Sequence, residues 1–141
     1  MKIRDVMTPN PRTVSPNDTI QTAARVMQTE DTGAVPVVTD GRVLAVVTDR
    51  DIAVRVVAQG GSASGPVSDV ATRGVICATP DMSTREAADL MAEHQVRRLP
   101  VVEADRLVGI VSIGDLAVKE GKDSRIGDTL QSISEGVKET I

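Results

Sequence analysis

The chain has 141 residues, 40% of them hydrophobic and 26% charged, a composition typical of one folded domain or two small ones rather than of a disordered protein. Its formal net charge of −4 argues against nucleic acid as a partner, because phosphate backbone is gathered by basic surfaces. The chain contains no Phe, Trp or Tyr, which excludes base-stacking platforms and the aromatic belts of membrane proteins.

Two reactive residue types occur once each, which limits the chemistry further. Cys77 has no second cysteine for an internal disulfide, and His94 has no second histidine with which to build a zinc site. We expect Cys77 to be an inert, buried thiol, and we expect no metal ion. No apolar run approaches the ~18 residues of a membrane span, and residues 1–14 contain no hydrophobic signal segment. These features predict a cytoplasmic protein without a membrane partner.

Residues 1–60 change periodicity in a regular order, from strand to helix, then to two strands and a second helix. The helix shows apolar residues at the spacing i, i+3, i+4, i+7. Asp40–Gly41 stands between two β-branched runs, which is a signal for a tight hairpin. The predicted elements are, in chain order, 13–14, 20–27, 35–38, 43–47 and 49–58.

A second copy of this unit follows at an offset of 64 positions (100 − 36), since the sequence around Pro36 returns around Pro100. Ser83 stands three residues before Glu86, which is a capping-box signature for the start of the second copy's first helix. Residues 60–66, with the sequence GGSASGP, have the composition of a flexible connector. The predicted elements of the second copy are 76–78, a helix from Ser83 through Met91, 99–102, 107–111 and 114–119.

The repeat predicts two domains, 1–60 and 67–121, in an α/β (α+β) fold of tandem βαββα units. Each copy is near the size at which a lone core becomes marginal, so we expect the two to pack together about a pseudo-twofold axis. The near-continuous apolar runs predict strands with helices over at least one side of the sheet. Residues 122–141 predict one further amphipathic helix, which either closes the module or offers a face to a partner.

The order of these motifs resembles that of the CBS domain pair, also called a Bateman module, over residues 1 to 121. Each motif alone is weak, but their order, found twice, is specific. The resemblance implies a stand-alone regulatory module that senses adenine nucleotides (AMP, ADP or ATP) or a related adenosyl ligand and signals to an unidentified protein partner, commonly as a homodimer. The motifs that carry it are DVMT (5–8), TVSP (13–16), VPVV (35–38), VVTDRDI (46–52), HQVRRLPVV (94–102) and LVGIVSIGDL (107–116).

The resemblance also implies ribose contacts at the starts of the second helices. Asp51 and Asp115 would bind the ribose hydroxyls, and Thr48 and Ser112, three residues earlier, would line the sugar and phosphate region. The chemistry is reasonable, because a carboxylate can accept hydrogen bonds from both hydroxyls of a vicinal diol and a helix N-terminus favours an anionic phosphate.

Phosphate contacts and adenine pockets are implied in the same way. Arg98 precedes Leu99–Pro100 and is the first phosphate candidate, with Arg97 and Arg50 as further ones. Ala34 stands where the second copy has Arg98, so unequal occupancy of the two clefts is expected. In similar proteins two clefts lie between the paired repeats. One cleft would contain Ser112, Asp115, Thr19, Thr32, Ala34 and Arg98. The other would contain Thr48, Asp51, Ser83, Val96 and Arg98.

Two other interpretations remain open on the sequence. A hydroxyl three residues before a carboxylate also caps a helix, and Arg97 and Arg98 can be solvated surface charges. The protein would then be a structural or stress-related dimer with empty clefts. An enzyme is the third possibility, but the sequence offers no nucleophile with a base, no metal cluster and no pair of functional acids. We therefore expect no catalytic residue and no cofactor beyond a regulatory nucleotide.

Overall fold

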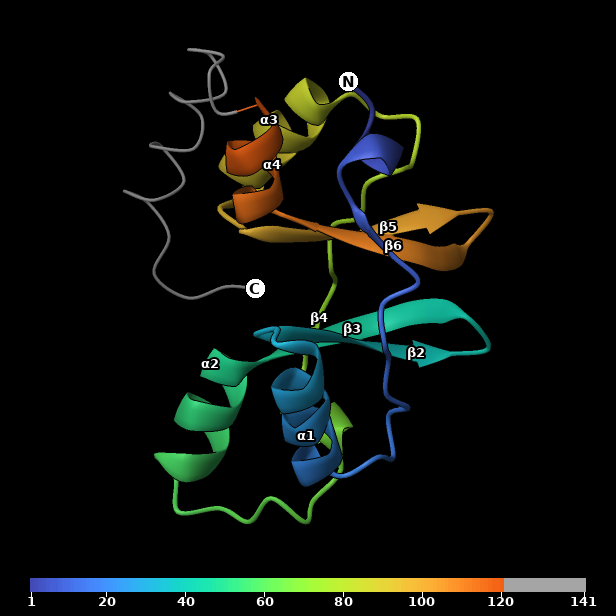
Figure 1. Ribbon diagram of the computed structural model, residues 1–141. Coiled ribbons are helices and arrows are strands. Elements are labelled where there is room, and N and C mark those ends of the chain that lie inside the picture. The colour runs from blue at the N-terminus through green and yellow to red at the C-terminus, as the bar shows by residue number, and fades with distance from the viewer. Residues whose placement is uncertain (121–141) are drawn as a thin grey trace. The chain divides into compact units, whose positions relative to one another are not determined.

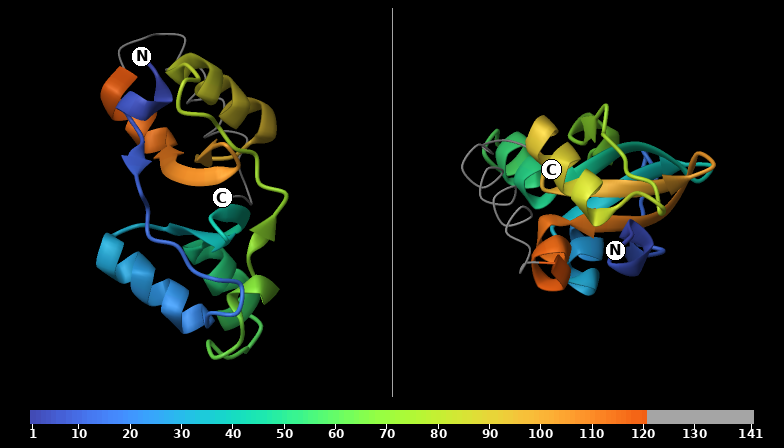
Figure 2. Two further views of the ribbon diagram at one scale, coloured as in Figure 1. Left: turned by 90° about the vertical axis from the view of Figure 1, so that its right-hand side faces the viewer. Right: turned by 90° about the horizontal axis from the view of Figure 1, so that it is seen from above.

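The computed structural model describes residues 1–120, with side chains through Val118 (Figure 1). They fold into two units, one made of residues 1–10 and 76–120 and the other of residues 11–75. Each unit contains one three-stranded antiparallel sheet, and its longer helices lie on one face of that sheet (Figures 1 and 2). The predicted α/β class is thereby confirmed. The helix predicted for 122–141 lies outside the described residues.

The unit of residues 11–75 has the strand order β2-β3-β4. Its core joins the apolar face of its long helix, including Ile20 and Ala23, to alternate strand residues such as Val35 and Val47. The helix residues that recur about every 3.6 positions and the strand residues that recur every second position pack against one another in this core. The elements are α1 (Ile20–Glu30), β2 (Ala34–Thr39), β3 (Arg42–Thr48), α2 (Asp49–Ile52), the π-helix η2 (Ala53–Val57), the 3-10 helix η3 (Val67–Asp69) and β4 (Thr72–Arg73).

The other unit repeats this plan with the strand order β1-β6-β5. Its core is formed around Met91, Leu99, Val111 and Leu116, all fully buried. None of the helices in residues 1–120 is long and apolar enough to cross a lipid bilayer. The elements are the 3-10 helix η1 (Ile3–Asp5), β1 (Thr8–Pro9), α3 (Thr84–His94), β5 (Arg98–Glu103), β6 (Arg106–Ser112) and α4 (Ile113–Glu120).

Local sequence signals account for most of these boundaries. Thr19 and Ser83 are the N-caps of α1 and α3, where their hydroxyls accept the N–H of the residue three positions later. The hairpin β2–β3 turns through Asp40 and Gly41, whose φ angles of 53° and 80° are those of a type I′ turn. The predicted capping box between Ser83 and Glu86 has two reciprocal contacts. The structure contains one of them, in which the Glu86 N–H donates to Ser83 Oγ at 3.0 Å.

The first residues of each repeat pack into the unit of the other repeat. Ile3 is fully buried in the core around Met91, and its N–H donates to the carbonyl of Met82 at 2.9 Å. Val67 is fully buried in the core of residues 11–75, and its N–H donates to the carbonyl of Asp18 at 2.8 Å. The chain therefore crosses between the units twice. Each unit combines most of one repeat with the first residues of the other.

The extended pieces predicted at 13–14 and 76–78 form single parallel bridges rather than strands. Val14 bridges to Val37, and Ala78 bridges to Val101. The third strand of each sheet is instead supplied by the exchanged segments, since β1 pairs with β6 and β4 pairs with β3. These two short strands were not predicted, because two residues carry no detectable periodicity.

Candidate functional site

A hydroxyl and a carboxylate close the turn between β3 and α2. Thr48 is the last residue of β3 and the N-cap of α2, and its Oγ1 accepts the Asp51 N–H at 3.0 Å. Asp51 Oδ2 in turn accepts the Thr48 N–H at 2.9 Å, which completes a capping box. Both residues are buried. The box holds the carboxylate of Asp51 in one orientation at the start of the helix.

The second repeat contains the same arrangement at the turn between β6 and α4. Ser112 Oγ accepts the Asp115 N–H at 3.1 Å, and Asp115 Oδ2 accepts the Ser112 N–H at 2.8 Å. Both residues are half-buried. The capping interpretation of these residues is therefore satisfied in both repeats. Capping uses one carboxylate oxygen in each case, and the other oxygen, Oδ1, takes no part in the box.

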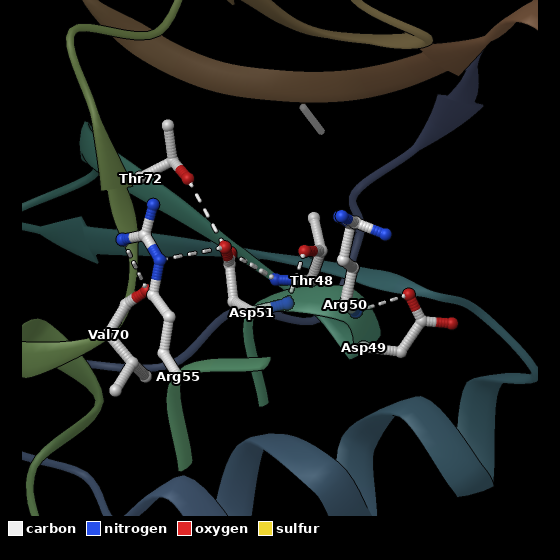
Figure 3. Close-up of polar contacts among 7 residues, drawn as sticks. All are labelled: Thr48, Asp49, Arg50, Asp51, Arg55, Val70 and Thr72. Atoms are coloured by element: carbon white, nitrogen blue, oxygen red, sulfur yellow. Dashed lines mark hydrogen bonds and ion pairs between the residues drawn. The ribbon is translucent and has the colours of Figure 1, made fainter. Parts of the chain in front are cut away.

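Asp51 has further partners that the sequence analysis missed (Figure 3). The Thr72 hydroxyl donates to Asp51 Oδ1 at 3.5 Å, and Arg55 Nε lies 3.7 Å from the same oxygen. Arg55 Nη1 also donates to the Val70 carbonyl at 3.2 Å. The i, i+4 spacing of Asp51 and Arg55 was a usable signal. Thr72 gave no such signal, because it lies 21 positions after Asp51 in the chain.

The phosphate candidates lie near the same turns. Arg98 is the first residue of β5 and pairs directly with Ser112, and it is half-buried. Arg97 is exposed, and its carbonyl accepts the Ile113 N–H at 2.8 Å. Arg50 lies in α2, is exposed, and donates its N–H to Asp49 Oδ1 at 2.8 Å (Figure 3). The fold thus places Arg98 opposite Ser112 in the β5–β6 ladder.

The predicted adenine-pocket residues of the first repeat lie at two places in its unit. Ala34 begins β2 and pairs with Thr48, as Arg98 pairs with Ser112 in the other sheet. Thr32 Oγ1 contacts the backbone of Ala34 at 3.3 Å, whereas Thr19 lies at the start of α1. The structure brings Thr32, Ala34 and Thr48 together.

Two more pocket candidates, Ser83 and Val96, belong to the other unit. Ser83 caps α3, and Val96 is half-buried in the turn before β5. Each predicted cleft combines residues of both units, and this assignment stays a prediction.

The two single reactive residues differ in their surroundings. Cys77 is half-buried rather than buried, and desolvation raises the pKa of its thiol. A raised pKa lowers the thiolate fraction at neutral pH. His94 is exposed at the end of α3. Within the described part of the chain, no group of three or more His, Cys, Asp and Glu side chains is placed to hold a metal ion.

Comparison with known proteins identifies the family. The profile of the CBS domain matches residues 3–58 and 67–119, which is most of the chain and both repeats. The chain belongs to the CBS domain family. It is 47% identical over 132 residues to the CBS domain-containing protein YhcV of Bacillus subtilis (strain 168), and the match covers 94% of each chain. The predicted resemblance to a CBS domain pair is confirmed.

Two solved CBS structures contain adenosyl ligands. The CBS domain pair of protein MJ0100, in complex with 5′-methylthioadenosine and S-adenosyl-L-methionine, superposes with a TM-score of 0.78 at 27% identity, over 86% of this chain and 97% of that one. CBSX2 in complex with AMP superposes with a TM-score of 0.73 at 25% identity, over 87% and 98%. Both of these neighbours therefore bind adenosyl ligands. In the present CBS pair, the capping boxes occupy matching positions in the two repeats.

Proposed function

We propose that this CBS protein is a regulatory sensor that binds an adenosyl ligand at the two capping-box turns and signals the bound state to a partner protein. The observation that carries the proposal is the matched pair of carboxylates, Asp51 and Asp115, each oriented by a backbone N–H at the start of its helix. The AMP complex of CBSX2 and the S-adenosylmethionine complex of MJ0100 support this ligand class.

The geometry suits recognition of a ribose. In each capping box Oδ2 is held by the main chain, so Oδ1 is the atom that would accept from a vicinal diol. The neighbouring hydroxyls of Thr48 and Ser112 add a polar group at the same turn. Hydrogen bonds to a charged acceptor contribute about 1.5 to 3 kcal/mol each. Two such bonds would supply a large part of the binding free energy, although the chain has no aromatic residue to stack on the adenine.

The phosphate preference of the two turns should differ. Arg98 lies opposite Ser112, whereas the small, buried Ala34 lies opposite Thr48. Arginine binds phosphate through charge-assisted hydrogen bonds, which are stronger than neutral ones. The turn of Asp115 is therefore proposed to prefer a phosphorylated ligand such as AMP. The turn of Asp51 is proposed to bind it more weakly.

The rest of the proposal follows from composition and from the family. It assigns the protein no catalytic residue and no cofactor. It also places the protein in the cytoplasm as a homodimer, formed by closed, self-complementary contacts. The alternative is a structural dimer of the same fold without a ligand, in which the capping boxes stabilise helices and do nothing else. Ligand binding separates the two functions directly.

The first test is the absorbance spectrum of the purified protein. The chain contains no Trp or Tyr, so its absorbance at 280 nm is close to zero and a copurified adenine nucleotide produces a distinct band near 260 nm. Extraction and chromatography of that material then identify the ligand. A spectrum without the band leads to the second test, with added ligand.

The second test is calorimetric titration with AMP and adenosine. Asp115→Ala should weaken binding at its turn by about 1.5 to 3 kcal/mol or more, and Asp115→Asn should weaken it less. Asp105→Asn removes one charge from an exposed position of the β5–β6 hairpin and serves as the control. If the wild type gives no heat with AMP, adenosine or S-adenosylmethionine, the structural dimer is the better description.

A further inference from the structure

The carboxylate of Asp51 is tied to the segment that follows the connector between the repeats (Figure 3). Thr72 donates to Asp51 Oδ1 at 3.5 Å, and Arg55 Nε lies 3.7 Å from that oxygen. Arg55 Nη1 also donates to the Val70 carbonyl at 3.2 Å. All of these residues belong to the unit of residues 11–75. A single arginine thus spans from the candidate ribose acceptor to Val70, two residues before β4.

These contacts surround the carboxylate oxygen that a ribose would use. A carboxylate offers about four lone-pair positions, two on each oxygen. The Thr48 N–H uses one on Oδ2, and the Thr72 hydroxyl uses one on Oδ1 at 3.5 Å. The Arg55 guanidinium lies 3.7 Å from Oδ1 as an ion pair, beyond hydrogen-bond distance. A diol whose two hydroxyls both reach Oδ1 therefore competes with Thr72 and Arg55 for this oxygen.

Arg55 is the partner most able to leave. The Thr48 N–H is fixed by the capping box and the buried end of β3. The Asp51 side chain is 10% exposed, whereas the Arg55 side chain is 52% exposed and its Nε is 3.7 Å from the carboxylate. An exposed, long ion pair contributes little to stability. Displacement of Arg55 therefore costs less than disruption of the capping box.

The second repeat differs at the matching position. Lys119 stands where the first repeat has Arg55, at the same offset of 64 (119 − 55). A guanidinium carries five donors in a planar fork and can engage a carboxylate and a carbonyl together, whereas an ammonium group is a compact charge. The helix also differs, because residues 53–57 are π-helical and α4 is a regular α-helix. The two repeats therefore differ in sequence at this position.

We propose that Arg55 is a positioning residue that couples ligand binding at Asp51 to the segment Val70–Arg73. A ribose diol at Asp51 displaces Arg55 and thereby releases the Val70 carbonyl. Strand β4 pairs with β3 through two residues, Thr72 and Arg73, so the loss of the Arg55 contact to Val70 loosens the start of a short strand while Val67 and Val70 stay buried in the core. This inference rests on the proposed function of Asp51 and assigns to that turn a means of transmitting the bound state.

Calorimetry measures the competition between Arg55 and the ligand. Asp115→Ala in the full chain isolates the turn of Asp51, and Arg55→Gln is added to it, with adenosine and AMP as probes. Removal of the competing group should tighten adenosine binding about fivefold, the effect of a weak ion pair together with a hydrogen bond. Arg12→Ala removes the same charge and an exposed ion pair with Glu30 at 3.6 Å in the same unit, and should leave the affinity unchanged.

Hydrogen exchange measures the release of the segment. Adenosine should speed exchange of residues 67–75 in the wild type severalfold. Ligand-free Arg55→Gln should already show this faster exchange, and adenosine should add little to it. Arg12→Ala should behave as the wild type does. Arg55→Lys provides a milder variant that retains the charge, and its exchange rate should fall between those of the wild type and Arg55→Gln.

The following results would overturn the inference. Unchanged adenosine affinity in Arg55→Gln would show that Arg55 does not compete with the ribose. A loss of affinity confined to AMP would show that Arg55 holds the phosphate instead. Absence of heat from the wild type with both probes would overturn the proposed function and this inference with it. Binding by the wild type that is insensitive to Arg55 would overturn this inference alone.

Discussion

Arg4 and Asp81 lie 77 positions apart and form an ion pair in which Arg4 Nη2 and Nε donate to one carboxylate oxygen at 2.6 and 3.2 Å. Lys2 Nζ lies 3.7 Å from the same oxygen. These contacts hold the first residues of the chain against the turn before α3. They belong to the exchange by which each repeat gives its first segment to the unit of the other.

The Arg4–Asp81 pair predicts a pH dependence for the attachment of the N-terminal segment. The hydrogen bond and charge of Arg4 hold the pKa of Asp81 below its ordinary value of 3.8. Because the folded pKa is depressed, the contact is fully present above the ordinary pKa and is lost as the pH falls through the lower, folded value. In an NMR titration, Arg4→Ala should raise the Asp81 midpoint toward 3.8. An equal midpoint in wild type and Arg4→Ala would contradict the assignment, and Arg12→Ala is the control.

The exchange of segments predicts which part of the chain folds alone. A fragment of residues 1–60 lacks Val67 and Val70, which belong to the core of its unit, and lacks β4. A fragment of residues 11–75 contains that core and all three strands. Thermal melts followed by circular dichroism should show a cooperative transition for 11–75 and a weak or absent one for 1–60. Equal melting of the two fragments would contradict this prediction.

Gly109 is required by the close approach of β1 to β6. A Cβ at this position would lie 2.5 Å from Met7 Sδ and 3.0 Å from the Thr8 carbonyl oxygen. Gly109→Ala should therefore lower the free energy of unfolding by about 1 to 3 kcal/mol, the usual cost of overpacking. Gly114→Ala is the matched control, because its nearest contact would be Ser112 Oγ at 3.5 Å. Denaturant unfolding measures both, and an equal effect of the two substitutions would refute the steric explanation.

Arg98 predicts a difference between phosphorylated and unphosphorylated ligands. Its position opposite Ser112 favours a charge-assisted contact with phosphate. Arg98→Ala should weaken AMP about tenfold and adenosine much less, and the difference should shrink with added salt. Calorimetry at two salt concentrations measures this. Equal losses for the two ligands would mean that Arg98 shapes the turn, and a larger effect of Arg97→Ala would move the phosphate contact to Arg97.

The sequence alone determined the repeat, the helix faces and the hairpins, and it offered the two capping boxes as one of the open interpretations. These features depend on residues close together in the chain. Thr48 and Asp51 are three positions apart, and the hairpin at Asp40–Gly41 needs only residues that accept positive φ angles. Because such contacts are local, their geometry follows from spacing and residue type. The offset of 64 transfers the capping pair to Ser112 and Asp115, whereas the second hairpin turns through Ala104 and Asp105 at positive φ without the Asp–Gly signal.

Only the tertiary structure decided which segments complete each sheet and what surrounds the candidate ribose acceptors. The burial of Ile3 in the core around Met91 and the contact of Thr72 with Asp51 join segments whose separations carry no periodic signal. Two-residue strands such as β1 and β4 gain their conformation from the partner strand rather than from their own propensity. The two repeats are similar in sequence, so local patterns could not tell which core each first segment joins. That choice depends on long-range packing, which exists only in the folded chain.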